Sequence, residues 1–191
     1  MSRESFTLAK RMGTTHHLSP LLMKANRIGL KSPEDLEKLA IHRGLRYYDP
    51  HGDSMADSHA RAESSDSTGE HAFSNEELAL ALLSPAAPYS QQRLRMSAAM
   101  IAAEGNKPET IALLARRERS EPIIRHIACC GVTAEPQNPF WGTLLQMLPQ
   151  SPAPAKDVLP HLTRFVAMTG LSRTGKGPFM KWIRPTNPQT S

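Results

Sequence analysis

The sequence has few aromatic residues, two cysteines and no long apolar run. Phe, Trp and Tyr make up 5% of the 191 residues, so a core must be built mainly from Leu, Ile, Ala and Met. These residues favour helices, because strands depend on β-branched and aromatic side chains. No window approaches the run of about 20 apolar residues that a membrane span needs, and no apolar stretch follows the basic residues near the start of the chain. We therefore expect an all-α protein with no membrane contact and no secretory signal.

The two cysteines are adjacent, so a disulfide cannot join distant segments. This usage is typical of a reducing compartment, and we expect a cytoplasmic protein. Cys129 and Cys130 follow His126 by three and four residues, spacings that place side chains on one face of a helix. Zinc needs three or four ligands, and no further cysteine or histidine pair has suitable spacing. We therefore expect both cysteines to be small core residues, and we expect no metal, cofactor or catalytic site.

Charge is unevenly distributed along the chain, whose net charge is +5. Two basic segments flank an acidic one, and the acidic stretch is rich in Ser, Ala, His and Gly. It has too little apolar surface to offset its ordering entropy, so we expect it to be a disordered linker. The predicted domains are a basic N-terminal segment over 1–48, the acidic linker over 49–73, a helical repeat domain over 74–170 and a basic tail or cap over 171–191.

The N-terminal segment contains the signals of one helical hairpin. Residues 1–17 lack hydrophobic periodicity and are expected to fray. Leu, Ala and Ile recur at helical spacing over residues 18–28, and Gly29 follows as a stop. Ser32 precedes a proline, which predicts a helix start because serine caps the free N–H groups and proline needs no N–H there. Gly44 is the expected end of this second helix.

Helical signals resume at Ser74, which forms a capping box with Glu77. Further starts are predicted at Asn106 and Asn138, each followed within two residues by a proline. Gly131 is a predicted helix end. These signals divide the region into three pairs of helices, and the last helix is expected over 157–169.

Two short phrases recur in this region. The first recurs with a constant spacing of 31 residues, as Ala81-Leu82-Leu83, Ala112-Leu113-Leu114 and Thr143-Leu144-Leu145. The second follows each of these, as Arg95-Met96-Ser97-Ala98, Arg125-His126-Ile127-Ala128 and Arg164-Phe165-Val166-Ala167. A fixed period with two helices per unit predicts a short stack of about three antiparallel helical hairpins. An irregular helical bundle whose hairpins have similar lengths is the alternative.

The phrases resemble HEAT and related α-solenoid repeats over about residues 74–170. In that family a Leu-rich first helix precedes a second helix that carries Arg followed by small residues, as Leu82, Arg95 and Ala98 do here. The resemblance implies a scaffold that presents a helical surface to a partner, and it implies no chemistry.

Basic residues are the candidate contacts with a partner or an anion. They are Arg116, Arg117 and Arg119 at the end of one predicted helix, and Arg173, Lys176, Lys181, Trp182 and Arg184 near the C-terminus. The first group also suits the negative end of a helix dipole, and the tail can either cap the last repeat or grip RNA. We expect a non-enzymatic interaction module that binds a protein. The alternative is an RNA- or DNA-associated protein that uses its basic N-terminal segment and C-terminal tail.

Overall fold

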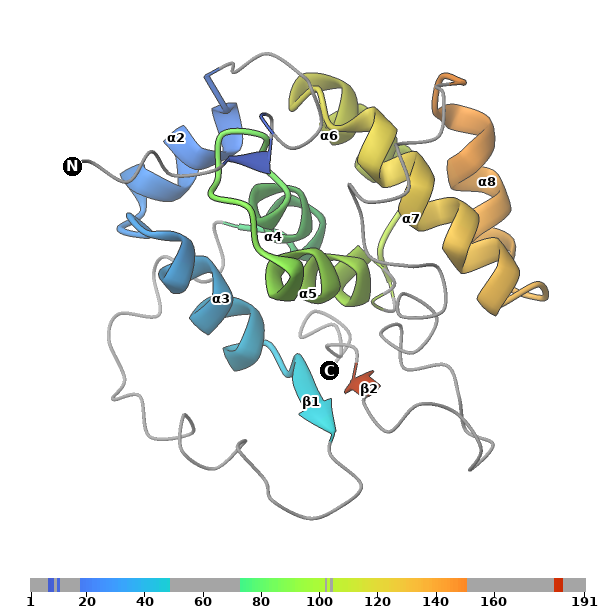
Figure 1. The fold of residues 1–191 in the computed structure, drawn as a ribbon, viewed down its shortest axis with the longest axis horizontal. Coiled ribbons are helices and arrows are strands. Elements are labelled where there is room, and N and C mark those ends of the chain that lie inside the picture. The colour runs from blue at the N-terminus through green and yellow to red at the C-terminus, as the bar shows by residue number, and fades with distance from the viewer. Residues whose placement is uncertain are drawn as a thin grey trace.

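Helices form most of the part of the chain that the structure describes (Figure 1). The computed structural model describes residues 7, 8, 10, 18–48, 73–101, 103, 105–150 and 181–183. The helices in these residues are α2 (Pro20–Arg27), α3 (Pro33–His42), α4 (Asn75–Leu82), α5 (Gln91–Ile101), α6 (Pro108–Arg117), α7 (Glu121–Ala134) and α8 (Pro139–Met147). The strands are β1 (Arg46–Tyr48) and β2 (Lys181–Ile183). The predicted all-α fold is confirmed, with one short strand pair added.

The N-terminal hairpin, α2 and α3, begins and ends where its capping residues predict. The Ser19 hydroxyl accepts the N–H of Leu22, and Ser32 forms a reciprocal capping box with Asp35. Gly29 and Gly44 follow the two helices with φ of +93° each, a conformation that glycine adopts without steric cost.

The α4–α5 hairpin forms the centre of the molecule and is buried almost all round. Ser74 and Glu77 form the predicted capping box at the start of α4. Every residue from Leu78 to Leu83 is at most 3% exposed, as are the apolar residues from Met96 to Ile101 in α5. Helix α4 contacts α2 and α3 on one side and α6 on the other. A helix that is apolar on all faces is one that other elements enclose, and here the N-terminal hairpin encloses it directly.

Helix α8 packs against both α6 and α7. Two arginines satisfy carbonyls at its C-terminal end: Arg116 donates to Met147 at 2.8 Å, and Arg125 donates to Leu145 and Leu148. These carbonyls have no partner within their own helix, so the two guanidinium groups fix where α8 ends.

Three local expectations are wrong. Helix α7 continues through Gly131 to Ala134, because Gly131 lies against the ring of Trp141 and makes room for it. The Asn106 amide donates to the carbonyls of Met100 and Ile101, so it closes α5, while Lys107 precedes α6. Leu8 is only 4% exposed and donates its N–H to the carbonyl of Ala87, so this part of 1–17 is not frayed.

The burial of the two repeated phrases distinguishes the two predicted arrangements, a stack of equivalent helical hairpins and an irregular helical bundle. In the first phrase, Leu82 and Leu144 are 3% and 0% exposed, whereas Leu113 is 57% exposed. In the second phrase, Ala98 and Ala128 are both fully buried. The first phrase therefore does not occupy equivalent positions, and neighbouring helices pack as in a helical bundle. The third copy of the second phrase, with Arg164, and the predicted helix over 157–169 lie outside the described residues.

The strand pair joins the end of the predicted N-terminal segment to the predicted C-terminal tail. Strands β1 and β2 are antiparallel, with Tyr47 opposite Trp182 and Tyr48 opposite Lys181, and β2 contacts α5. This pairing was not predicted. The predicted linker lies outside the described residues, except that Phe73, its last residue, is 1% exposed and belongs to the core.

Candidate functional site

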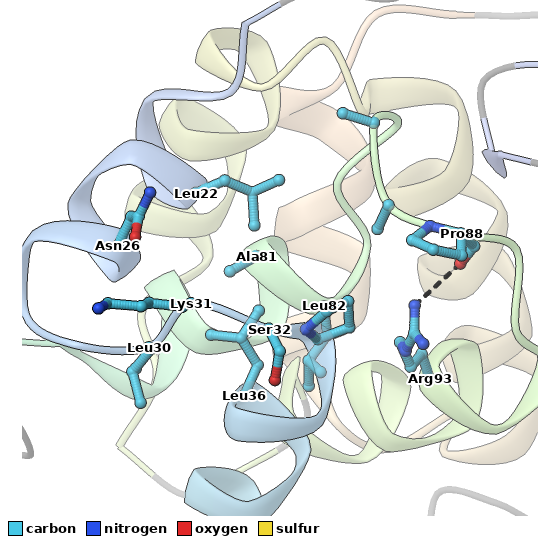
Figure 2. A pocket seen from close by; sticks show the side chains of 13 residues that line it. Leu22, Asn26, Leu30, Lys31, Ser32, Leu36, Ala81, Leu82, Pro88 and Arg93 are labelled. Atoms are coloured by element: carbon cyan, nitrogen blue, oxygen red, sulfur yellow. Dashed lines mark hydrogen bonds between the residues drawn. The ribbon is translucent and has the colours of Figure 1, made fainter. Parts of the chain in front are cut away.

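A pocket of about 230 Å³ lies between the N-terminal hairpin and the α4–α5 hairpin (Figure 2). Its lining is mainly apolar. The lining residues are Leu22, Asn26, Leu30, Lys31, Ser32, Pro33, Leu36, Ala81, Leu82, Ala86, Ala87, Pro88 and Arg93. Leucines and alanines from α2, α3 and α4 form its walls, and its polar groups are few.

Arg93 links the two hairpins at this pocket. Arg93 donates from Nε to the carboxylate of Glu37 at 2.7 Å and from a terminal nitrogen to the carbonyl of Pro88 at 3.0 Å. The Ser32 hydroxyl accepts the N–H of Asp35, and the Lys31 side chain extends away from Leu82 in Figure 2. The residues that line this pocket include no carboxyl, imidazole or thiol group.

The vicinal cysteines and His126 lie on α7 as the spacing predicts. The Cys130 sulfur lies 3.9 Å from Nε2 of His126. Burial, with the neighbouring Cys129, raises the pKa of the Cys130 thiol to about 12, so it is not a nucleophilic thiolate near neutral pH. Cys130 is buried as predicted, whereas Cys129 is exposed and that expectation is wrong. Within the described ranges, no group of three or more His, Cys, Asp and Glu side chains could hold a metal ion.

Acidification should destabilise the protein through His126. Burial lowers the pKa of this imidazole below 6.5, so the unfolded state binds the proton more readily than the folded state. The free energy of unfolding therefore falls as the pH falls below about 6.5, through the folded-state pKa. We expect urea titrations across this range to show a shallower pH dependence for His126→Gln than for the parent. Identical pH dependence in the two proteins would contradict this assignment.

At the basic end of α6, some side chains are exposed to solvent and one is buried in the core. Arg117 and Arg119 are exposed, and Arg119 adopts a φ of +51°, which is uncommon for a residue other than glycine. Arg116 is also exposed, and it caps α8. Glu118 is 1% exposed and accepts hydrogen bonds from the hydroxyl of Ser19 and the N–H of Leu21. Of the three predicted contacts, Arg116 therefore has a structural role, and Arg117 and Arg119 point to solvent.

We define the α6 face as Glu109, Leu113, Arg116 and Arg117, the exposed side chains of this helix. The spacing of these residues places them on one side of α6, opposite the buried residues Ile111, Leu114 and Ala115. Leu113 is 57% exposed between charged neighbours. Leu113 and Glu109 were not among the predicted contacts, because the repeated phrase was interpreted only as part of a structural repeat. The signal that could have found them is helical spacing, because the charged residues Glu109 and Arg117 lie four residues before and after Leu113.

The C-terminal candidates are described only in part. Lys181 and Trp182 lie on β2, paired with β1 and beside α5. Arg173, Lys176 and Arg184 lie outside the described residues. Within the part of the chain that the structure describes, the predicted basic residues that lie together are those at the end of α6.

Comparison with known proteins adds no relative to this geometry. No model of a protein family, no curated protein and no solved structure matches the chain. Within its described part, no helix has both the length and the apolar character needed to cross a membrane.

Proposed function

We propose that this protein is a non-enzymatic interaction module that binds another macromolecule through the α6 face. The observation that carries the proposal is the exposure of Leu113, a large apolar side chain between charged residues on one helix. Leu18 is 75% exposed and precedes Ser19, which bonds to Glu118 at the end of the same helix. The two most exposed large apolar residues of the described chain therefore adjoin α6, and a partner that covered them would gain by removing both from water.

A protein suits this face better than a nucleic acid does. Phosphate recognition favours several cations without nearby acids, and base stacking uses aromatic side chains. The α6 face has an apolar leucine at its middle and a carboxylate, Glu109, at its start. These features match the mixed surface of a protein partner, with an apolar centre and charged edges.

Nucleic-acid binding is the second candidate, and the tail favours it. Lys181 and Trp182 are adjacent in β2, so a cation and an aromatic residue alternate on this strand. The net charge of +5 favours an anionic partner. Anisotropy of a labelled single-stranded RNA, measured against salt concentration, tests this candidate: steep salt-dependent binding that is lost with Trp182→Ala and Lys181→Ala would favour it.

A photo-crosslinking experiment tests the leading proposal. A benzophenone amino acid at position 113 should form crosslinks to another macromolecule, and the Arg117→Glu change in the same chain should reduce them several-fold. The matched control places the same amino acid at Val132, which is 37% exposed on α7. Crosslinking of equal yield at both positions, or none at position 113, would contradict the proposal.

A further inference from the structure

When α6 is turned end for end, each charge along one row of the α6 face takes the place of a charge of the opposite sign. Glu109 lies four residues before Leu113, and Arg117 lies four residues after it. Positions at intervals of four form one row on a helix surface, so an acid, a leucine and a base follow one another along α6. All three side chains are exposed. Turning this row end for end places the base where the acid was.

We infer that the partner of the α6 face is a second copy of this chain, bound with the two α6 helices antiparallel. A two-fold axis through Leu113 places Leu113 against Leu113 of the second copy. Glu109 then faces Arg117 of the second copy, and the same pair repeats on the other side of the axis. The inference deepens the proposed function, on which it rests, by naming the partner.

A different acidic partner would match this face less well. It would pair with Arg117 but place its own negative charge near Glu109. Arg116 lies beside Arg117, and its guanidinium already donates to the carbonyl of Met147. Arg116 therefore needs an acidic group of a partner less than Arg117 does. The order of signs along the row, negative then apolar then positive, is satisfied at every position by the reversed row of a second copy.

The pairing predicts a weak dimer. The contact is one helix wide, and exposed ion pairs contribute little in water. Lys107 and Arg119 lie just beyond the two ends of α6, so a reversed second copy brings these like charges to the same ends of the contact. We therefore expect dissociation in the high micromolar range, and weaker association at high salt.

Sedimentation equilibrium of the full chain, from low micromolar to millimolar concentration, tests the inference. Glu109→Arg and Arg117→Glu each place like charges opposite one another twice, and each should weaken self-association at least tenfold. Lys38→Glu changes an exposed lysine on α3 by the same charge as Arg117→Glu and should leave association unchanged. All of these positions are exposed, so circular dichroism should show that every variant folds as the parent does.

Mixing the two reversed variants gives the decisive result. A heterodimer of Glu109→Arg and Arg117→Glu restores an opposite-charge pair on both sides of the axis, so the equimolar mixture should associate about as well as the parent. The doubly reversed chain should likewise recover self-association. Failure of both rescues, or a dimer unaffected by the single reversals, would overturn the inference.

The outcomes separate this inference from the proposed function. A parent protein that stays monomeric at every concentration overturns the second-copy inference alone, provided that position 113 still crosslinks to a different macromolecule. Absence of crosslinks at position 113 overturns both. A crosslinked product of twice the chain mass, formed at position 113 and absent at Val132, supports both.

Discussion

Replacing Gly131 with alanine is expected to lower the free energy of unfolding by about 3 kcal/mol, which is the upper end of the usual cost of overpacking a core. In a helix interior, alanine is ordinarily more favourable than glycine by about 1 kcal/mol. Here a Cβ atom would overlap the six-membered ring of Trp141. We expect this overlap to outweigh the gain in helix propensity, because the ring of Trp141 cannot shift away. Gly131→Ala is therefore destabilising.

The ring of Trp141 is held on several sides. It is fully buried, its indole N–H donates to the carboxylate of Glu135 at 2.5 Å, and the ring of Phe140 meets it edge-on with centroids 5.0 Å apart. Moving the indole away from position 131 would lengthen that hydrogen bond and disturb the packing of α7 against α8. Because these surroundings are rigid, one added methyl group is expected to lower the free energy of unfolding substantially.

Gly142 provides the matched control for this prediction. It lies within α8, and a Cβ atom there would meet nothing within 4 Å. Gly142→Ala should therefore raise the free energy of unfolding by roughly 0.5–1 kcal/mol, through helix propensity alone. Urea denaturation followed by circular dichroism measures both variants. A Gly131→Ala protein as stable as the parent would show that the indole does not occupy the space beside α7.

The helix starts that could be predicted are those whose signals are local. Ser32 and Ser74 bond to backbone N–H groups three residues ahead, so the sequence of one turn contains the whole motif. Asn138 likewise accepts the N–H of Phe140. These elements form because neighbouring residues satisfy one another, and such motifs can be recognised without knowledge of the rest of the fold.

The features that were missed depend on contacts between distant segments. Gly131 has the residue type of a helix end, and only the position of Trp141 explains why the helix continues. Leu113 belongs to a repeated phrase, and its exposure follows from which side of α6 meets α4 and α8. The repeated phrase alone could therefore not assign the α6 face, because it recorded the helical period but not the orientation of the helix.

The role of Glu118 also depends on contacts between distant segments. Replacing this residue is expected to have the second large effect on the free energy of unfolding. Its carboxylate accepts the Ser19 hydroxyl at 2.5 Å and the Leu21 N–H at 2.9 Å, across about a hundred residues of sequence. The Ser19 oxygen in turn accepts the N–H of Leu22. A carboxylate from the end of α6 thus satisfies the start of α2, where the helix dipole also favours negative charge.

Glu118→Ala is expected to lower the free energy of unfolding by about 3 kcal/mol, since it leaves buried donors without an acceptor and removes two charge-assisted hydrogen bonds. Arg117→Ala, one residue away and exposed, should change it by no more than about 0.5 kcal/mol. Adding Ser19→Ala to Glu118→Ala should cost less than Ser19→Ala costs in the parent, because the two changes remove the same hydrogen bond.

Hydrogen exchange shows which part of the molecule Glu118→Ala destabilises, whereas the free energy of unfolding reports only the total change. In the Glu118→Ala protein, the amides of Leu21 and Leu22 should exchange faster, since the start of α2 opens without global unfolding. Amides in the α4–α5 hairpin should change only by the global loss of stability. If the start of α2 kept its protection, Glu118 would contribute through general packing at the end of α6, and the carboxylate would not be what holds α2 in place.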